Sequence, residues 1–270
     1  MRRLRLAKLC PGALDGRVNM RGIGIDIGST ATKVAVLNEA GELVRAEVRP
    51  TGFSSVEAAE SVRTFLEESG CLSQPHAIVA TGYGRVAVPY ADKVVTEITC
   101  HGKGATHLFG ADGVVVDIGG QDTKVIKLKD GKVAKFIMND KCSAGTGRFL
   151  EIMADRLAVT QADMARMARE GTPTPISNMC TVFAESEVIS LVGKGEPREN
   201  IANGVIESVV ARVATLVLQM PGGSYFLTGG LCENDYVVER LGVRLGSVVA
   251  TCPEARYAGA IGAALCALDL

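Results

Sequence analysis

A short motif occurs twice in this chain of 270 residues. Residues 24–37 read GIDIGSTATKVAVL and residues 113–126 read GVVVDIGGQDTKVI, so both contain Asp-Ile-Gly, three further residues and then Thr-Lys-Val. The two copies are offset by the same 91 positions throughout, from Asp26 to Asp117. Turn signals and further apolar runs follow each copy, which predicts strand, turn, strand, turn, strand in both halves. A period this long indicates a duplicated domain and not a solenoid repeat.

The first polar turn of each copy has the residues of an anion site. Gly28-Ser29-Thr30 and Gly119-Gly120-Gln121 place small and polar residues where one strand bends back to the next. Glycine lets backbone N–H groups approach a phosphate closely, and hydroxyls add donors. The aspartates at the strand ends, Asp26 and Asp117, suit Mg²⁺ or its bound waters. Two facing turns would clamp a triphosphate, whereas one such hairpin alone is more often an ordinary glycine turn.

The composition argues against several classes of function. The formal net charge is −1, aromatic residues make up 4% of the chain and Trp is absent, which argues against a nucleic-acid partner. The sequence contains no run of about 18 apolar residues, so no membrane span is predicted. The eight cysteines include no CxxC pair, so neither a zinc ribbon nor a thioredoxin-like site is expected. We therefore expect a protein of the reducing cytoplasm, with no nucleic-acid and no membrane partner.

Residues 1–21, MRRLRLAKLCPGALDGRVNMR, form a basic and irregular leader. Lys8, Pro11 and Asp15 interrupt the continuous apolar segment that a signal peptide needs. We expect this leader to be disordered or loosely attached, with Met20 as an alternative translation start.

Two cysteines precede helical patterns. Cys142 lies in NDKCSAGTGRFLE, ahead of an apolar helical face, and Cys180 opens CTVFAESEVIS 38 residues later. A helix N-terminus carries about half a positive charge, which stabilises a thiolate or the sulfurs of an iron–sulfur cluster. A [4Fe–4S] cluster needs four thiolates, so two such chains would supply the full set. Spacing alone favours the plainer alternative of two buried structural thiols.

The paired turns resemble the two phosphate loops of the actin, Hsp70 and sugar-kinase ATPase superfamily. A third element fits the same resemblance, because residues 225–231, YFLTGGL, predict a short apolar strand running into Gly229 and Gly230. In that superfamily such a strand leads into the adenosine loop. The resemblance implies an α/β architecture, namely a duplicated RNase H-like ATPase fold with two domains around a nucleotide cleft.

Longer stretches resemble the activator component of 2-hydroxyacyl-CoA dehydratases, in the family that also includes ATP-binding subunits of benzoyl-CoA reductase. The most specific are NDKCSAGTGRFLE and CTVFAESEVIS, and matching stretches extend over residues 22–266. The resemblance implies a homodimeric ATPase that uses ATP and Mg²⁺ and shares one [4Fe–4S] cluster between its subunits, bound by Cys142 and Cys180. It also implies a dehydratase partner and reduced ferredoxin or flavodoxin as the electron donor. The full GGQD sequence at 119–122 favours the activator branch.

These interpretations assign roles to particular residues. Asp26 and Asp117 are predicted to position Mg²⁺ and its waters, and Gln121 or Asp122 to orient the water that attacks ATP. His101 is expected near the hinge or cleft as a satisfied structural histidine. The residues predicted to bind the nucleotide are Gly28, Ser29, Thr30, Ala31, Thr32, Lys33, Gly119, Gly120, Gly229, Gly230 and Asn234.

The repeat also predicts the domain boundaries. Domain I should hold residues 22–110 and 251–270, because the small residues near the end of the chain suit close packing of a returning helix, and domain II should hold residues 111–250. Helices are predicted over residues 146–157, 180–192, 201–219 and 257–267.

Three other functions compete with a dehydratase activator. A benzoyl-CoA reductase-type subunit would carry the same nucleotide loops. A small-molecule kinase of the superfamily would need an acceptor pocket with a catalytic Asp and would show no visible absorbance. A non-enzymatic, actin-like scaffold would form polymers. An anaerobic spectrum with an iron count per dimer would separate an iron–sulfur protein from the kinase and the scaffold.

Overall fold

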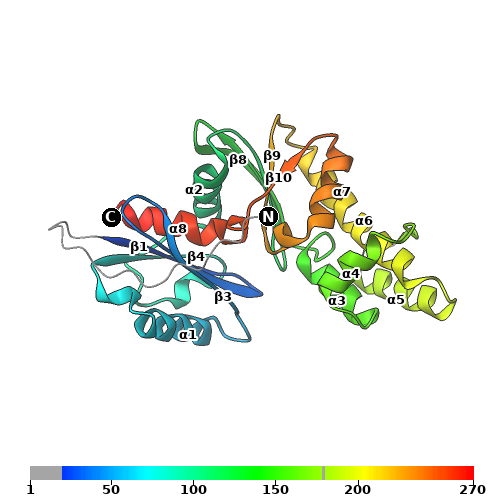
Figure 1. The fold of residues 1–270 in the computed structure, drawn as a ribbon, viewed down its shortest axis with the longest axis horizontal. Coiled ribbons are helices and arrows are strands. Elements are labelled where there is room, and N and C mark those ends of the chain that lie inside the picture. The colour runs from blue at the N-terminus through cyan, green and yellow to red at the C-terminus, as the bar shows by residue number, and fades with distance from the viewer. Residues whose placement is uncertain (1–19, 178–179) are drawn as a thin grey trace.

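The computed structural model describes residues 20–177 and 180–270 and consists of two halves, each built on a five-stranded sheet (Figure 1). The first half contains β1 (Arg21–Ile27), β2 (Ala31–Leu37), β3 (Leu43–Pro50), α1 (Ser55–Glu68), β4 (His76–Thr81), β5 (Lys93–Val94) and α8 (Ala258–Leu268). α2 (Glu97–Phe109) lies between the halves. The second half contains β6 (Gly113–Ile118), β7 (Thr123–Lys129), β8 (Lys132–Asn139), α3 (Gly147–Arg156), α4 (Gln161–Ala168), α5 (Thr181–Gly193), α6 (Arg198–Val217), β9 (Tyr225–Gly229), α7 (Asp235–Leu245) and β10 (Val249–Ala250).

The basic leader predicted for residues 1–21 lies outside the described residues except for its last two. Met20 donates a backbone hydrogen bond to Glu39 Oε1, and Arg21 already begins β1. The helices predicted from apolar periodicity are α3, α5, α6 and α8, and their ends differ from the predicted bounds by at most three residues.

The two sheets have the same topology. Their strand orders are β3-β2-β1-β4-β5 and β8-β7-β6-β9-β10. In each sheet the first strand pairs antiparallel with the second and parallel with a later strand. The irregularities match as well, because the register shifts between Val36 and Leu37 in one sheet and between Lys127 and Leu128 in the other. The predicted duplication is therefore confirmed at the level of strand pairing.

α8 covers one face of the first sheet, and α1 covers the opposite face. The sequence of α8, AGAIGAALCAL, consists mostly of small residues, so its backbone can come close to the sheet. An ideal Cβ on Gly24 of β1 would lie 1.9 Å from the Ala260 carbonyl oxygen, and one on Gly22 would lie 2.3 Å from that of Ala264. Only glycine permits this approach between strand and helix.

A long buried helix organises the second half. α6 carries Ile201, Val205, Val209 and Val213 along one face, each at most 2% exposed, which confirms the core positions predicted from four-residue spacing. α3, α4 and α7 contribute to the same hydrophobic core. α6 has the length and apolar composition of a membrane span, but 61% of its apolar window is buried inside the molecule, as is usual for a core helix.

α2 packs on both halves. Towards the first half it contacts α8, and an ideal Cβ on Gly104 would lie 1.9 Å from the Ala258 carbonyl oxygen. Towards the second half, Phe109 stacks on Phe226 with ring centroids 4.8 Å apart. The layers through the middle of the molecule are therefore first sheet, α8, α2 and second sheet (Figure 1). The sequence grouped α2 with domain I, and the structure shows that it contacts both sheets.

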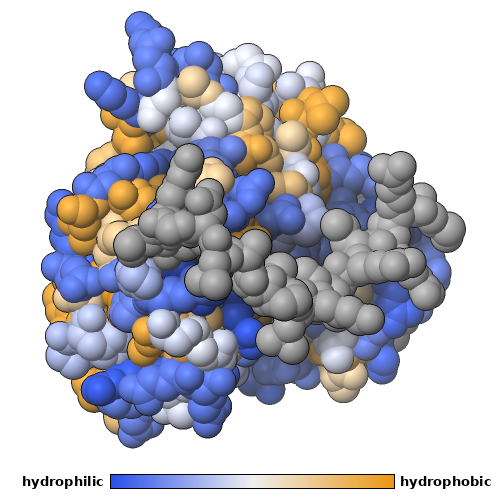
Figure 2. All heavy atoms as spheres, turned by 60° about the vertical axis from the view of Figure 1, so that its left-hand side comes forward, coloured by the Kyte–Doolittle hydropathy of each residue, from blue (hydrophilic) through white to orange (hydrophobic). Residues whose placement is uncertain are grey.

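Large apolar side chains reach the surface at scattered places. On the face shown in Figure 2, hydrophobic side chains are interspersed among hydrophilic ones. In the second half, α5 exposes Val182, Phe183 and Ile189, each more than half accessible. These side chains follow Cys180, so this cysteine lies beside apolar surface.

The contact between β1 and α8 predicts that replacing Gly24 by Ala destabilises the folded protein. The added methyl group has no room beside the Ala260 carbonyl, so the helix or strand must shift, and we expect a loss of about 1–3 kcal/mol in the free energy of unfolding. Urea denaturation measures this loss. Gly223→Ala is the matched control, because an ideal Cβ there meets nothing within 4 Å. Equal stabilities of the two variants would contradict the proposed backbone contact.

Candidate functional site

A cleft of about 630 Å³ opens between the two halves, a volume in the range of small-ligand sites. Both polar turns of the sequence repeat line it. The predicted site residues that line the cleft are Asp26, Gly28, Ser29, Thr30, Ala31, Lys33, Asp117, Gly119, Gly120, Gln121, Asp122, Gly229 and Gly230. Four predicted residues lie outside this lining: Thr32, Asn234, Cys142 and Cys180.

Thr32 lies behind the first turn. Its buried hydroxyl shares a hydrogen bond of 2.9 Å with Thr51 Oγ1. Thr51 in turn donates to the carbonyl oxygen of Gly28 at 2.7 Å, so Thr32 must be the donor of the first bond. Thr32 therefore fixes the shape of the turn, while Ser29 and Thr30 are exposed to the cleft.

The two turns touch across the cleft. In the second turn the backbone N–H of Gly119 donates to the Asp122 carbonyl at 2.9 Å. An ideal Cβ on Gly120 would lie 2.0 Å from Thr30 Oγ1, so glycine at this position lets the turns meet. The structure thus brings the two repeated turns, 91 positions apart in the chain, to one place.

Strand register pairs the aspartate of each repeat with its lysine. Asp26 lies opposite Lys33, and Lys33 Nζ is 3.6 Å from Asp26 Oδ2. Asp26 is 2% exposed, and its Oδ1 has no hydrogen-bond partner among the described residues. A buried carboxylate oxygen with spare capacity suits a divalent cation or a water bound to one.

Asp117, the equivalent residue of the second half, has more partners. Thr228 Oγ1 donates to its Oδ1 at 2.8 Å, His101 Nε2 lies 3.3 Å from the same oxygen, and Lys124 Nζ lies 3.6 Å from Oδ2. Burial raises the pKa of Asp117, but the charges of His101 and Lys124 outweigh it and hold the pKa well below its usual range. Asp117 is therefore an anion at neutral pH.

Lys124 joins three carboxylates although it is only 1% exposed. Besides its contact with Asp117, its Nζ lies 2.9 Å from Glu97 Oε1 and 2.6 Å from Asp122 Oδ2. Burial lowers the pKa of Lys124, but the three carboxylates reverse this effect and raise it above the ordinary value. For Asp122 the order is different, because burial raises its pKa more than Lys124 lowers it.

Three residues of this network were not among the predicted site residues. His101 was expected as a structural histidine near the hinge or cleft, and the structure places it in the cleft lining against Asp117. Glu97, His101 and Asp117 have ligand atoms within 4.8 Å of one another. The repeat itself points to Lys124 as the counterpart of Lys33, and the four-residue spacing of Glu97 and His101 puts both on one helix face.

The end of β9 forms another wall of the cleft through Gly229 and Gly230. Gly229 has a φ of +81°, and an ideal Cβ there would lie 2.4 Å from the Ile118 carbonyl oxygen, so glycine is required. Asn234 follows this wall but caps α7, because its Oδ1 accepts a hydrogen bond from the Val237 backbone N–H at 3.1 Å. The side chain that was predicted to contact the nucleotide is thus engaged as a helix cap.

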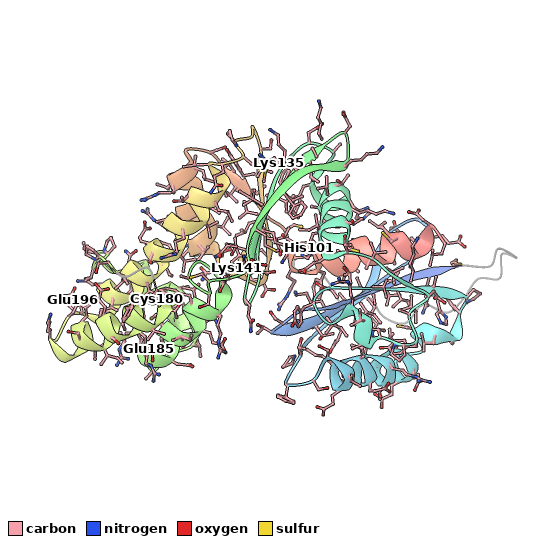
Figure 3. All side chains as sticks on the ribbon, turned by 180° about the vertical axis from the view of Figure 1, so that it is seen from behind. His101, Lys135, Lys141, Cys180, Glu185 and Glu196 are labelled. Atoms are coloured by element: carbon pink, nitrogen blue, oxygen red, sulfur yellow. The ribbon has the colours of Figure 1, made fainter. Side chains whose placement is uncertain are left out.

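Cys142 and Cys180 lie together in the second half, away from the cleft lining. Both are exposed, which does not fit buried structural thiols. The residues that follow them, Ser143 and Thr181, share a hydrogen bond of 2.9 Å between their hydroxyls. Cys180 is also the N-cap residue of α5. Figure 3 shows Cys180 among the helices of the second half and His101 at the centre of the molecule.

The contact of His101 with Asp117 predicts a pH dependence of stability in nucleotide-free protein with EDTA present. Burial disfavours the charged imidazole, but Asp117 outweighs it and raises the pKa of His101 from 6.5 to about 9. The stabilising contribution is complete below the unfolded value of 6.5 and is lost as the pH rises through 9. We expect this loss to be about 1–3 kcal/mol.

Urea unfolding across this pH range measures the effect. His101→Gln should lose this part of the pH dependence, while His107→Gln, an exposed change on the same helix, should keep it. Identical pH profiles for His101→Gln and the unchanged protein would contradict a charged His101 in the folded state.

Known proteins are similar to this chain in sequence and in fold. The chain is 43% identical over 256 residues to the activator of lactoyl-CoA dehydratase from Anaerotignum propionicum, covering 93% of this chain and 98% of the relative. The structure matches an activator of the 2-hydroxyisocaproyl-CoA dehydratase from Clostridium difficile with bound ADPNP, with a TM-score of 0.87, 35% identity, and coverage of 93% of this chain and 95% of that one. A ROK family glucokinase from Streptomyces griseus, in complex with glucose and AMPPNP, matches with a TM-score of 0.60 and 14% identity over 93% of this chain and all of that one, which shows a common fold alone.

These matches confirm the expected two-domain α/β ATPase fold and the family resemblance drawn from the sequence. The model of the BadF/BadG/BcrA/BcrD ATPase family matches residues 23–267, nearly the whole chain. The chain therefore belongs to the BadF/BadG/BcrA/BcrD ATPase family.

Proposed function

We propose that this chain is an ATP-hydrolysing activator that transfers electrons to a partner 2-hydroxyacyl-CoA dehydratase. The observation that carries the proposal is the hydrogen bond between Ser143 and Thr181, which holds the two exposed cysteines, Cys142 and Cys180, on one surface. A nucleotide cleft and a pair of exposed thiols in one chain are what an ATP-driven electron-transfer protein needs. Membership of the family adds ATP hydrolysis to this combination.

The two turns that line the cleft suit the phosphates of a nucleotide. The two turns meet at Thr30 and Gly120, so donors from both halves converge on one place. Lys33 lines the same wall and supplies a positive charge. Gly229 and Gly230 leave backbone open for the adenosine end. The donors of the two turns would position the phosphates, and Lys33 would neutralise part of their charge. Positioning and charge neutralisation are the main requirements for phosphoryl transfer.

Asp26 and Asp117 are the residues that would hold Mg²⁺ or its bound waters. Asp26 has a buried oxygen with no partner among the described residues, and Asp117 is held as an anion by His101 and Lys124. Carboxylates of this kind would hold the metal directly or through its waters, and the metal would neutralise phosphate charge. Asp122 is engaged with Lys124 at 2.6 Å, so we assign the orientation of the attacking water to the exposed Gln121.

An iron–sulfur cluster fits the exposed cysteine pair. Each chain offers the exposed thiols of Cys142 and Cys180, so a second copy of the chain would complete the four ligands of one [4Fe–4S] cluster in a homodimer. The N-terminus of α5 directly follows Cys180, and its partial positive charge favours anionic sulfur. A cluster bound there would supply one-electron chemistry at low potential, and reduced ferredoxin or flavodoxin would be the electron donor. The exposed apolar side chains of α5 beside Cys180 suit a protein partner.

Backbone contacts connect the cleft to the cysteines. The N–H groups of Gly147 and Arg148, at the start of α3, donate to the carbonyl oxygens of Gly119 and Gly120, each at 2.9 Å. Between β8 and α3, Asn139 Nδ2 donates to the Cys142 carbonyl at 2.9 Å. A shift of the second turn on nucleotide binding therefore reaches the segment that bears Cys142. This link couples hydrolysis to the environment of the cluster.

Replacing Asp117 by Asn should reduce Mg-ATP hydrolysis at least about 100-fold, because a charge that positions the metal is lost. The iron content should not change. Asp112→Asn is the matched control at the opposite end of β6, where the side chain only accepts a hydrogen bond from Asp130. Asp26→Asn tests the same site if the first variant is unstable. Unaltered steady-state turnover in both cleft variants would refute the metal site.

Replacing Cys142 by Ser should remove the visible absorbance and the bound iron while ATP still binds. Anaerobic iron analysis should give about four iron atoms per two chains for the unchanged protein and background values for the variant. Cys252→Ser, which alters a partly exposed thiol outside the pair, should retain the cluster. A Cys142→Ser protein with full iron content would show that this cysteine is not a ligand.

A further inference from the structure

The interface between α2 and α8 joins the two halves of the molecule. α8 packs on the first sheet through Gly24, and α2 packs on the second sheet through Phe109. The two helices meet backbone to backbone, because an ideal Cβ on Gly262 would lie 1.8 Å from the Cys100 carbonyl oxygen. A change in the relative position of the sheets can therefore be absorbed by sliding at this contact.

Two thiols lie at this interface. Cys100 on α2 is fully buried, and Cys266 on α8, one helical turn after Gly262, is partly exposed. Cys266 packs against the hydrophobic cluster that contains Cys100, Ala263 and Ala267, which brings the two thiols together. Neither thiol lines the nucleotide cleft, and neither is a ligand of the proposed iron–sulfur cluster.

We propose that Cys100 and Cys266 form a redox-sensitive modification site, in which oxidation by a peroxide produces a disulfide that ties α2 to α8. The cross-link holds the two halves in one relative position and slows the ATPase cycle. This site does not depend on the presence of an iron–sulfur cluster.

The environment of the pair suits this chemistry. The neighbouring Cys100 thiol lowers the pKa of Cys266, burial opposes this effect, and the charge of Lys103 lowers the pKa further. Lys103 also forms an ion pair with Asp269 and donates to the Leu265 carbonyl at 3.2 Å, which keeps its charge beside α8. The accessible thiol is thus the nucleophile. The neighbouring Cys266 thiol and burial raise the pKa of Cys100, so Cys100 reacts second, as the resolving thiol, once Cys266 has become a sulfenic acid.

The reaction proceeds in two balanced steps. The Cys266 thiolate attacks hydrogen peroxide, the O–O bond breaks, and sulfenic acid and hydroxide form. The Cys100 thiol then attacks that sulfur, the S–S bond forms, and water leaves with the proton of Cys100. The two sulfurs are together oxidised by two electrons, and the peroxide is reduced by the same two. A dithiol such as dithiothreitol reverses the bond by thiol–disulfide exchange.

The cross-link acts on the cleft through α2. This helix carries Glu97 and His101, which contact Lys124 and Asp117. Domain movement during nucleotide turnover shifts Glu97, His101 and their partners relative to the first sheet. A covalent bond between α2 and α8 restricts that shift.

Peptide mapping of the purified protein tests the site directly. Trypsin releases Cys100 in residues 94–103 and Cys266 in residues 257–270, and neither peptide contains another cysteine. After anaerobic treatment with stoichiometric hydrogen peroxide and alkylation of free thiols, we expect these two peptides as one disulfide-linked species. Its absence, in protein whose other thiols have reacted, overturns the proposal.

ATPase rates test the consequence. We expect the oxidised protein to lose activity about fivefold or more and to recover it with dithiothreitol, because opening and closing limit turnover. Cys266→Ser and Cys100→Ser should keep their rates under the same treatment, whereas Cys252→Ser should respond like the unchanged protein. Damage at Cys142 and Cys180 is common to all four proteins, so the difference between them isolates the pair. Equal losses in all variants, or a complete cross-link with an unchanged rate, overturn the proposed restriction of movement.

Discussion

The buried pairing of aspartate with lysine in each half sets the geometry on which the cleft depends. Antiparallel register places Asp26 opposite Lys33 and Asp117 opposite Lys124. A carboxylate removed from water stays ionised only when cations or hydrogen-bond donors compensate for the lost solvation. Lysine on the neighbouring strand provides this compensation at the same point of both sheets. Each turn therefore begins beside a buried carboxyl group paired with lysine, and the cleft lies where these equivalent points meet.

The two copies differ in what surrounds this pair. Lys33 contacts Asp26, which keeps one oxygen without a partner in the described part of the chain. Lys124 contacts three carboxylates including Asp117, whose oxygens are occupied by side chains from three other elements. One aspartate is thus open to a ligand, while the other is held rigidly. The same motif supports two different tasks because its neighbours have diverged.

The sequence predicted most of the fold because the hairpin pairing of consecutive strands and the periodicity of helices are local properties. The repeat predicted both turns, and the spacing of apolar residues predicted the core face of α6. His101 was harder to interpret, since it reaches Asp117 from a helix whose place between the sheets is not encoded in its own residues. Asn234 is the opposite case, because its motif position suggested a nucleotide contact while a local helix cap engages its side chain. The place of His101 depends on long-range packing, whereas the side chain of Asn234 is held by a local helix cap, and its contact with the nucleotide stays a prediction.

The position of α8 affects how the chain folds as it is made. β1 is translated early, yet the surface around Gly22 and Gly24 is covered by residues 260–264 of α8. The second sheet and its helices come from one continuous stretch, β6 to β10, and can bury their core while still attached to the ribosome. The first sheet keeps one bare face throughout that time, and a chaperone that shields this face would act on the nascent chain until α8 emerges.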